Sequence, residues 1–129
     1  MNNQLKLFNL AQESAKKAYA PYSKFNVGAA ILSKRGHFYQ GCNVENVSYP
    51  VGTCAEESAI AAMVCNGEQH IEEILIFADS SQLITPCGAC RQRIAEFASR
   101  TTKIHLANSA GIQKTMTIDE LLPSSFKEF

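Results

Sequence analysis

The chain lacks several features that would assign it to whole classes of protein. It has no excess of charge of either sign, because 12 Lys and Arg balance 12 Asp and Glu in 129 residues. A polynucleotide-binding protein usually carries a basic excess, so we expect a small-molecule ligand and no nucleic acid partner. No apolar run approaches the roughly 18 residues of a membrane span, and the first residues lack the basic start and apolar stretch of a signal peptide. We therefore expect a cytoplasmic protein without a membrane partner.

Repeats, low-complexity tracts and obvious linkers are also absent. A chain of 129 residues, 46% hydrophobic and 19% charged, has the composition of one folded domain, which we expect to span residues 1–129. Its five cysteines are an odd number, and disulfides are not expected in a reducing compartment. Metal-binding or catalytic roles are therefore favoured for some of them. We expect Cys42 and Cys65 to be buried as small hydrophobic residues.

Hydrophobic periodicity predicts alternating helices and strands. Apolar residues at steps of three and four predict an amphipathic helix over residues 5–20, ended by Pro21. Further helices are predicted at 54–67 and 87–99, with a short helical turn within 118–126, and strands at 25–32, 37–44, 71–80, 103–108 and 114–118. This order predicts an α/β fold, a three-layer α/β/α sandwich with a five-stranded mixed sheet.

Three cysteines stand at the starts of two predicted helices. Cys54 opens the first, while Cys87 and Cys90 lie three residues apart on one face of the second. Because helix N-termini favour negative charge, we expect these thiols to ionise more easily than usual. Three thiolates would leave the fourth tetrahedral position of a zinc ion open, which is typical of catalytic sites. Taken alone, the C-x-x-C motif fits a redox pair or a zinc-knuckle fragment as well as it fits a catalytic site.

An acidic residue beside the first cysteine changes this balance. Glu56 follows Cys54 by two residues, within the first turn of the predicted helix. From there a carboxylate can move protons between a zinc-activated water nucleophile and a substrate nitrogen. The combined pattern C-x-E, then P-C-x-x-C, is the signature of zinc deaminases of nucleobases. A redox dithiol has no use for such a glutamate.

Longer motifs resemble those of the small, homotetrameric, zinc-dependent cytidine deaminase family. The segments APYSKFNVGAAI, GCNVEN, TCAE, PCGACRQ and ELLPSSF occur in that family's order and spacing, over nearly the whole chain. The resemblance implies a cytidine deaminase-like fold. It also implies an enzyme of pyrimidine salvage that hydrolyses cytidine and 2′-deoxycytidine to uridine and 2′-deoxyuridine plus ammonia. One Zn²⁺ per subunit and a homotetramer with active sites shared between subunits are implied as well.

The resemblance also implies roles for the residues around the metal. Cys54, Cys87 and Cys90 are the zinc ligands, and Glu56 is the catalytic proton shuttle. The backbone at Ala55, together with Glu56, reads the edge of the pyrimidine ring.

Five further residues are implied to bind substrate. Asn43 and Glu45 hold the ribose hydroxyls, and Phe25 packs on the nucleoside. Alternate residues of an extended segment point to one face, and an aromatic ring suits a flat base. Tyr49 lines a pocket shared between subunits, and Phe126 reaches into the site of a neighbouring subunit.

Glu57 departs from the family pattern. Many tetrameric members have an arginine directly after the catalytic glutamate, and it donates hydrogen bonds to the ligand sulfurs. Three thiolates on Zn²⁺ leave a net charge of −1, which such bonds offset, whereas an ionised glutamate cannot donate. In our first hypothesis Glu57 pairs with Arg91 or Arg93, and only backbone N–H groups at the two helix starts donate hydrogen bonds to the sulfurs. In the second, an arginine from elsewhere is the donor. Arg91 and Arg93 are otherwise expected to be surface or interface charges.

Three other functions fit parts of the pattern. A deaminase of a cytosine-bearing antibiotic such as blasticidin S would not need the ribose-binding pair. A polynucleotide-editing deaminase is disfavoured by the zero net charge and the short chain. A non-catalytic, zinc-stabilised interaction domain would hold metal without turnover and would have no use for Glu56.

Overall fold

The computed structural model describes residues 2–127, which fold around one sheet of five strands. The strands are β1 (Val27–Ser33), β2 (Phe38–Cys42), β3 (Ile71–Ala78), β4 (Ala98–Asn108) and β5 (Gly111–Met116). They lie in the order β2-β1-β3-β4-β5, with β3 and β4 parallel and the other pairs antiparallel. The predicted five-stranded mixed sheet is thus confirmed. The domain expected at 1–129 includes residues 1, 128 and 129, which lie outside the described residues.

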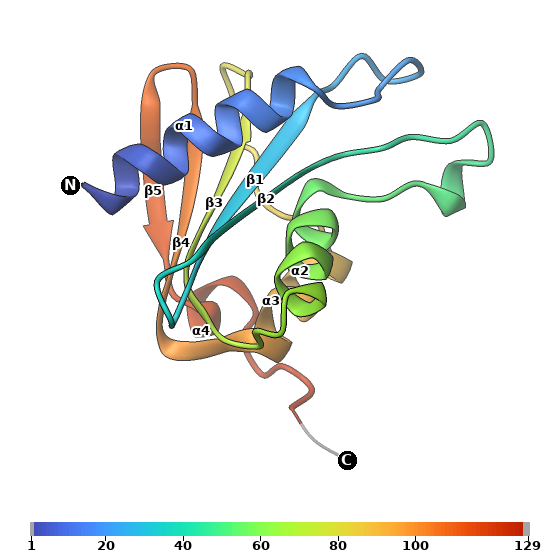
Figure 1. Ribbon diagram of the computed structural model, residues 1–129. Helices are drawn as coiled ribbons and strands as arrows, with labels where there is room; N and C mark the ends of the chain where they lie inside the picture. Colours follow the sequence, from blue (N-terminus) through green and yellow to red (C-terminus); the bar gives the residue numbers. More distant parts are fainter. Residues whose placement is uncertain (1, 128–129) are drawn as a thin grey trace.

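Helices cover both faces of this sheet, as Figure 1 shows. Helix α1 (Asn3–Lys16) packs on one face, where Leu7 and Ala11 join Leu75 and Phe77 in a buried cluster. The opposite face is covered by α2 (Ala55–Cys65), α3 (Gly88–Phe97) and α4 (Ile118–Leu121), around a second buried cluster. The predicted three-layer α/β/α arrangement is therefore confirmed. Of the helices in residues 2–127, none combines the length and apolar character that crossing a bilayer demands.

Two glycines allow α1 and α2 to approach the sheet closely from opposite faces. A Cβ atom on Gly28 in β1 would lie 1.9 Å from the carbonyl oxygen of Ala11 in α1. A Cβ atom on Gly41 in β2 would lie 2.4 Å from the amide nitrogen of Ala59 in α2. Since both obstacles are backbone atoms, neither site can hold a larger residue unless a helix moves.

We expect Gly41→Ala to destabilise the protein, because the added methyl group must push α2 away from β2. Overpacking of this kind typically costs about 1–3 kcal/mol in the free energy of unfolding, which urea denaturation will measure. Gly88→Ala is the matched control. A Cβ at Gly88 meets no atom within 4 Å, so its stability should be equal or slightly higher. Equal stability of both variants would contradict the close approach of α2.

Two segments, residues 18–26 and 43–53, project beyond the end of the sheet (Figure 1). Backbone hydrogen bonds join them, from Tyr19 N to Asn43 O at 3.0 Å and from Glu45 N to Tyr19 O at 2.8 Å. This pairing explains why the prediction of a helix to residue 20 was wrong. The helix ends at Lys16, before Pro21, because Tyr19 is held in a β-bridge with Val44.

Other predicted boundaries shift by a few residues. Strand β4 begins at Ala98 rather than at 103, directly after α3 ends at Phe97. Strand β2 is shorter than the predicted 37–44, and β5 begins and ends before the predicted 114–118. Cys65 is exposed at the end of α2, so its predicted burial was wrong, whereas Cys42 is half-buried.

Candidate active site

The first turns of α2 and α3 bring three cysteine sulfurs together. Cys54 is the N-cap residue of α2, Cys87 is the N-cap residue of α3, and Cys90 lies buried one turn further on. Their Sγ atoms all lie within 4.8 Å of one another. Zinc–sulfur bonds are about 2.3 Å long, so the cluster has the dimensions of a site for one metal ion. Among the described residues it is the one group of this kind.

The protonation of these thiols fits a site that needs a cation. Burial, together with nearby negative charge, raises the pKa values of Cys54 and Cys90. Burial also opposes ionisation of Cys87, but hydrogen bonds from the Cys90 backbone and from the Cys90 and Cys54 thiols together outweigh it and lower the pKa of Cys87. The expectation of easy ionisation at helix starts is thus wrong for two of the three thiols. A divalent cation is what would hold all three as thiolates.

Glu56 lies at the second position of α2 and is 5% exposed. Burial raises the pKa of its carboxyl group above the usual range. A carboxylate with a raised pKa accepts a proton more readily and can return it near neutral pH. Its place in the first turn, two residues after Cys54, was predicted from the spacing.

A cavity of about 460 Å³ is lined by Cys54 and by residues of the two projecting segments. Three of the predicted substrate-binding residues, Asn43, Glu45 and Tyr49, line it together with Cys54. The remaining lining residues are Tyr22, Ser23, Val44, Asn46, Gly52 and Thr53. A volume of this size accommodates a small organic molecule.

Asn43 and Glu45 are oriented by hydrogen bonds across the two projecting segments. The Asn43 side chain accepts from Val27 N and donates to Phe25 O, both at 2.8 Å. The Glu45 carboxylate accepts from the Ser23 hydroxyl and from two backbone N–H groups of the 22–23 turn. These bonds, with that of the hydroxyl strongest, lower the pKa of Glu45 and keep it ionised. Both side chains retain lone pairs, and the amide retains one N–H, for a ligand.

The three aromatic residues predicted to bind substrate lie in different places. Phe25 is 37% exposed, and Tyr49 is 75% exposed with its ring against that of Tyr22. Phe126 is 64% exposed and lines a different cavity, between α3 and the C-terminal segment. Within one chain, therefore, Tyr49 lines the 460 Å³ cavity, whereas Phe25 and Phe126 do not.

A chain of contacts links Glu57 to the sulfur cluster. The Glu57 carboxylate accepts from Cys54 N at 3.3 Å and pairs with Arg93 Nη2 at 3.5 Å. Arg93 Nη1 in turn donates to Cys90 Sγ at 3.5 Å. The predicted pairing of Glu57 with a cation is confirmed. The hypothesis that backbone N–H groups alone serve the sulfurs was wrong, because Arg93 is such a donor.

Arg91 has a structural role that the sequence interpretation missed. It is half-buried, and its guanidinium donates to Pro86 O, Leu121 O and the Thr85 hydroxyl at 2.9–3.0 Å. These bonds tie the loop before α3 to the end of α4. The expectation of a surface or interface charge is therefore wrong for Arg91. No local sequence signal distinguishes it, because its partners lie on two segments.

Comparison with known proteins gives a consistent result. The family model described as "Cytidine and deoxycytidylate deaminase zinc-binding region" matches residues 1–106. The cytidine deaminase of Sporosarcina psychrophila is 40% identical, over 95% of this chain and 90% of its own length. That of Halalkalibacterium halodurans is 41% identical, over 93% and 91%.

Solved structures agree with this result. Cytidine deaminase from Burkholderia pseudomallei superposes with a TM-score of 0.91 at 37% identity, over 98% of this chain and 100% of that one. The enzyme from Mycobacterium tuberculosis gives 0.84 at 32% identity, over 99% and 100%. Because the matched family region is a zinc-binding region and the chain has a three-cysteine cluster, zinc is its cofactor. The chain belongs to the cytidine deaminase family of enzymes.

Proposed function

We propose that this protein hydrolyses cytidine and 2′-deoxycytidine to uridine and 2′-deoxyuridine with release of ammonia, and that it serves pyrimidine salvage. One observation supports this above all. Cys54, which belongs to the sulfur cluster, also lines the cavity that contains Asn43 and Glu45. A metal at the cluster would thus adjoin polar groups suited to a ribose, with Glu56 beside it.

In the proposed reaction Glu56 is the proton carrier. Cys54, Cys87 and Cys90 would hold zinc, which when bound supplies a Lewis acid that makes a water molecule a stronger nucleophile near neutral pH. The Glu56 carboxylate takes a proton from the water that attacks C4 of cytosine. It delivers this proton to N3, then takes the remaining proton from the hydroxyl now bonded to C4 and passes it to the amino group, which leaves as ammonia as the C4 carbonyl forms. Its burial supports this role, since the charged form gains little from solvent there.

The rest of the cavity would hold the nucleoside. Asn43 and Glu45 bind the ribose hydroxyls, and their hydrogen bonds to the 22–27 segment fix them before substrate arrives. Phe25 packs on the nucleoside. The N–H of Ala55, at the first position of α2, has no acceptor one helical turn earlier, so it is suited to read the pyrimidine edge.

We further propose a homotetramer with shared active sites. Several apolar side chains on the projecting segments are highly exposed, including Val47 at 77% and Val51 at 65%, as surfaces that pair with another copy often are. Tyr49 would then line a pocket between subunits, and Phe126 would enter the cavity of a neighbour rather than that of its own chain. Sedimentation equilibrium should give four times the mass of the chain.

Ultraviolet absorbance with purified protein will test the activity. Cytidine and 2′-deoxycytidine should be converted to their uracil forms, and a zinc chelator should stop the reaction until zinc is restored. Blasticidin S should react far more slowly, because it lacks the ribose that Asn43 and Glu45 would bind. Zinc in the protein without turnover of any of these would instead indicate a metal-stabilised interaction domain.

A growth assay will test the salvage role. A pyrimidine-requiring bacterium without its own deaminase should grow on cytidine as sole pyrimidine source when it expresses this chain. Turnover in vitro without growth would separate the activity from the role in salvage.

A further inference from the structure

Two charged side chains connect the helix starts that present the sulfurs. Glu57 lies in the first turn of α2, and Arg93 lies in α3, three residues after Cys90. The guanidinium contacts both elements, with Nη2 3.5 Å from Glu57 Oε2 and Nη1 3.5 Å from Cys90 Sγ. At a spacing of three residues on a helix, Arg93 and Cys90 share a face. The contact between Arg93 and the Cys90 sulfur is therefore set by the geometry of α3. Glu57 pairs with the second terminal nitrogen of the same guanidinium.

The chemistry of a three-thiolate site explains why a donor at sulfur matters. Three thiolates around Zn²⁺ carry a net charge of −1, and N–H donors to the sulfurs offset this charge. Arg93 combines permanent charge with several N–H groups in one plane, so it can donate to sulfur and pair with a carboxylate together. Arg91 cannot share this task, because its guanidinium is engaged by Pro86, Leu121 and Thr85.

We propose that Arg93 is a positioning residue that stabilises the zinc-bound Cys90 thiolate through its N–H donor, and that Glu57 holds Arg93 in the donating orientation. This inference rests on the zinc site of the proposed function. Both charged side chains are 37% exposed, and exposed ion pairs contribute little to stability. The Glu57–Arg93 pair therefore acts by orienting the Arg93 guanidinium and adds little to the stability of the fold. The Glu57 carboxylate is itself held by the 3.3 Å hydrogen bond from Cys54 N.

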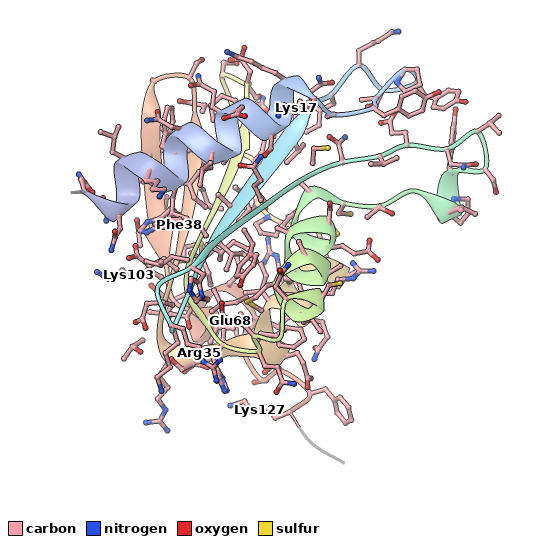
Figure 2. All side chains as sticks on the ribbon, in the orientation of Figure 1. Lys17, Arg35, Phe38, Glu68, Lys103 and Lys127 are labelled. Atoms are coloured by element: carbon pink, nitrogen blue, oxygen red, sulfur yellow. The ribbon has the colours of Figure 1, made fainter. Side chains whose placement is uncertain are left out.

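Zinc retention by Arg93→Met will test the proposal, because methionine keeps an unbranched side chain and removes every N–H donor. Loss of a partner of a metal ligand typically costs about 10–100-fold in metal affinity. We therefore expect zinc transfer to a competing chelator to be faster by roughly that factor. Arg35→Met is the matched control. Arg35 is exposed in the turn between β1 and β2 (Figure 2), and its loss should leave the transfer rate unchanged.

Two further readouts separate this role from a merely structural one. In the cobalt(II)-substituted protein, removing an N–H donor raises the energy of the sulfur lone pairs, so the thiolate-to-cobalt charge-transfer band should move to longer wavelength. Urea unfolding of the metal-free protein should change little, since the exposed pair adds little stability. A structural role would lower metal-free stability and leave the band in place.

Glu57→Gln provides a second, independent variant. Glutamine can still accept from Cys54 N but no longer attracts Arg93 by charge, so zinc transfer should accelerate less than in Arg93→Met. If Arg93→Met does not fold, this variant decides alone. Zinc transfer and the cobalt band both unchanged in the folded variants would overturn the inference. Wild-type protein that holds no zinc would instead overturn the proposed function.

Discussion

Glu56→Gln should lower kcat by about 10²- to 10⁴-fold, the range that a general acid–base group usually contributes. This loss corresponds to about 3–5 kcal/mol of barrier. The amide has the shape of the carboxylate but cannot take a proton from water. Steady-state kinetics with cytidine will measure the change, and the zinc content of the variant should stay at the wild-type level because Glu56 is not one of the three sulfur ligands.

The same substitution should leave the zinc-free protein as stable as the wild type, or make it more stable. Glu56 is 5% exposed, and burial raises its pKa, which means that the folded state disfavours the charged form. A neutral amide avoids that desolvation. Lost activity combined with equal or higher thermal stability is typical of a group retained for catalysis at a cost to the fold.

Glu72→Gln is the matched control for this experiment. Glu72 is an exposed acid on β3, and its loss should change neither kcat nor zinc content. A Glu56→Gln variant that kept kcat within about threefold of the wild type, with zinc bound, would exclude Glu56 as the proton carrier, since that factor lies far below the usual contribution.

The type and order of the main elements could be predicted from sequence because hydrophobic periodicity is local. The boundaries depended on contacts between distant segments. Helix α1 ends at Lys16 because Tyr19 pairs with backbone 24 or more residues later. Strand β4 starts early, and its first residues are largely polar and exposed, so they carry no strong periodic signal. This part of β4 is joined to β3 by a contact between distant residues, because the buried Thr102 hydroxyl donates a hydrogen bond to Ile71 O.

The metal cluster and Glu56 were predictable for a related reason. Their spacings lie within single helical turns, so the local sequence places each ligand, and only the meeting of α2 with α3 depends on the fold. The proximity of Arg93 to the Cys90 sulfur could have been predicted in the same way, because a spacing of three residues puts both side chains on one face of the helix. Arg91, one residue after Cys90, had no comparable signal. Its partners at Leu121 and in the loop before α3 are fixed by tertiary structure.

The fixed geometry of Asn43 and Glu45 also lay beyond the sequence. Their partners at residues 22–27 are separated from them by 16 to 23 residues. Read alone, such polar residues suggest a solvated turn. The structure places them on paired segments that line a cavity, with hydrogen bonds to residues 22–27 that fix their side chains.

Cys90→Ala should abolish zinc binding and reduce activity to background. Cys90 is fully buried in the first turn of α3, and its sulfur is one of three within 4.8 Å. Removing a ligand should cost more than the roughly 100-fold that loss of an outer partner can cost. Metal analysis should fall from one zinc per chain toward none. Cys65→Ala is the matched control, because Cys65 is exposed and outside the cluster, and it should keep both zinc and activity.

Thermal unfolding separates loss of zinc from damage to the fold. An ion that binds only the folded state raises Tm, so a chelator should lower Tm of the wild type and of Cys65→Ala. The same chelator should leave Cys90→Ala unchanged, because that variant has no zinc to lose, and its Tm should be close to that of the stripped wild type. Full zinc and activity in Cys90→Ala, or a disulfide among the three cysteines of the active wild type, would mean that the sulfur cluster is not the metal site.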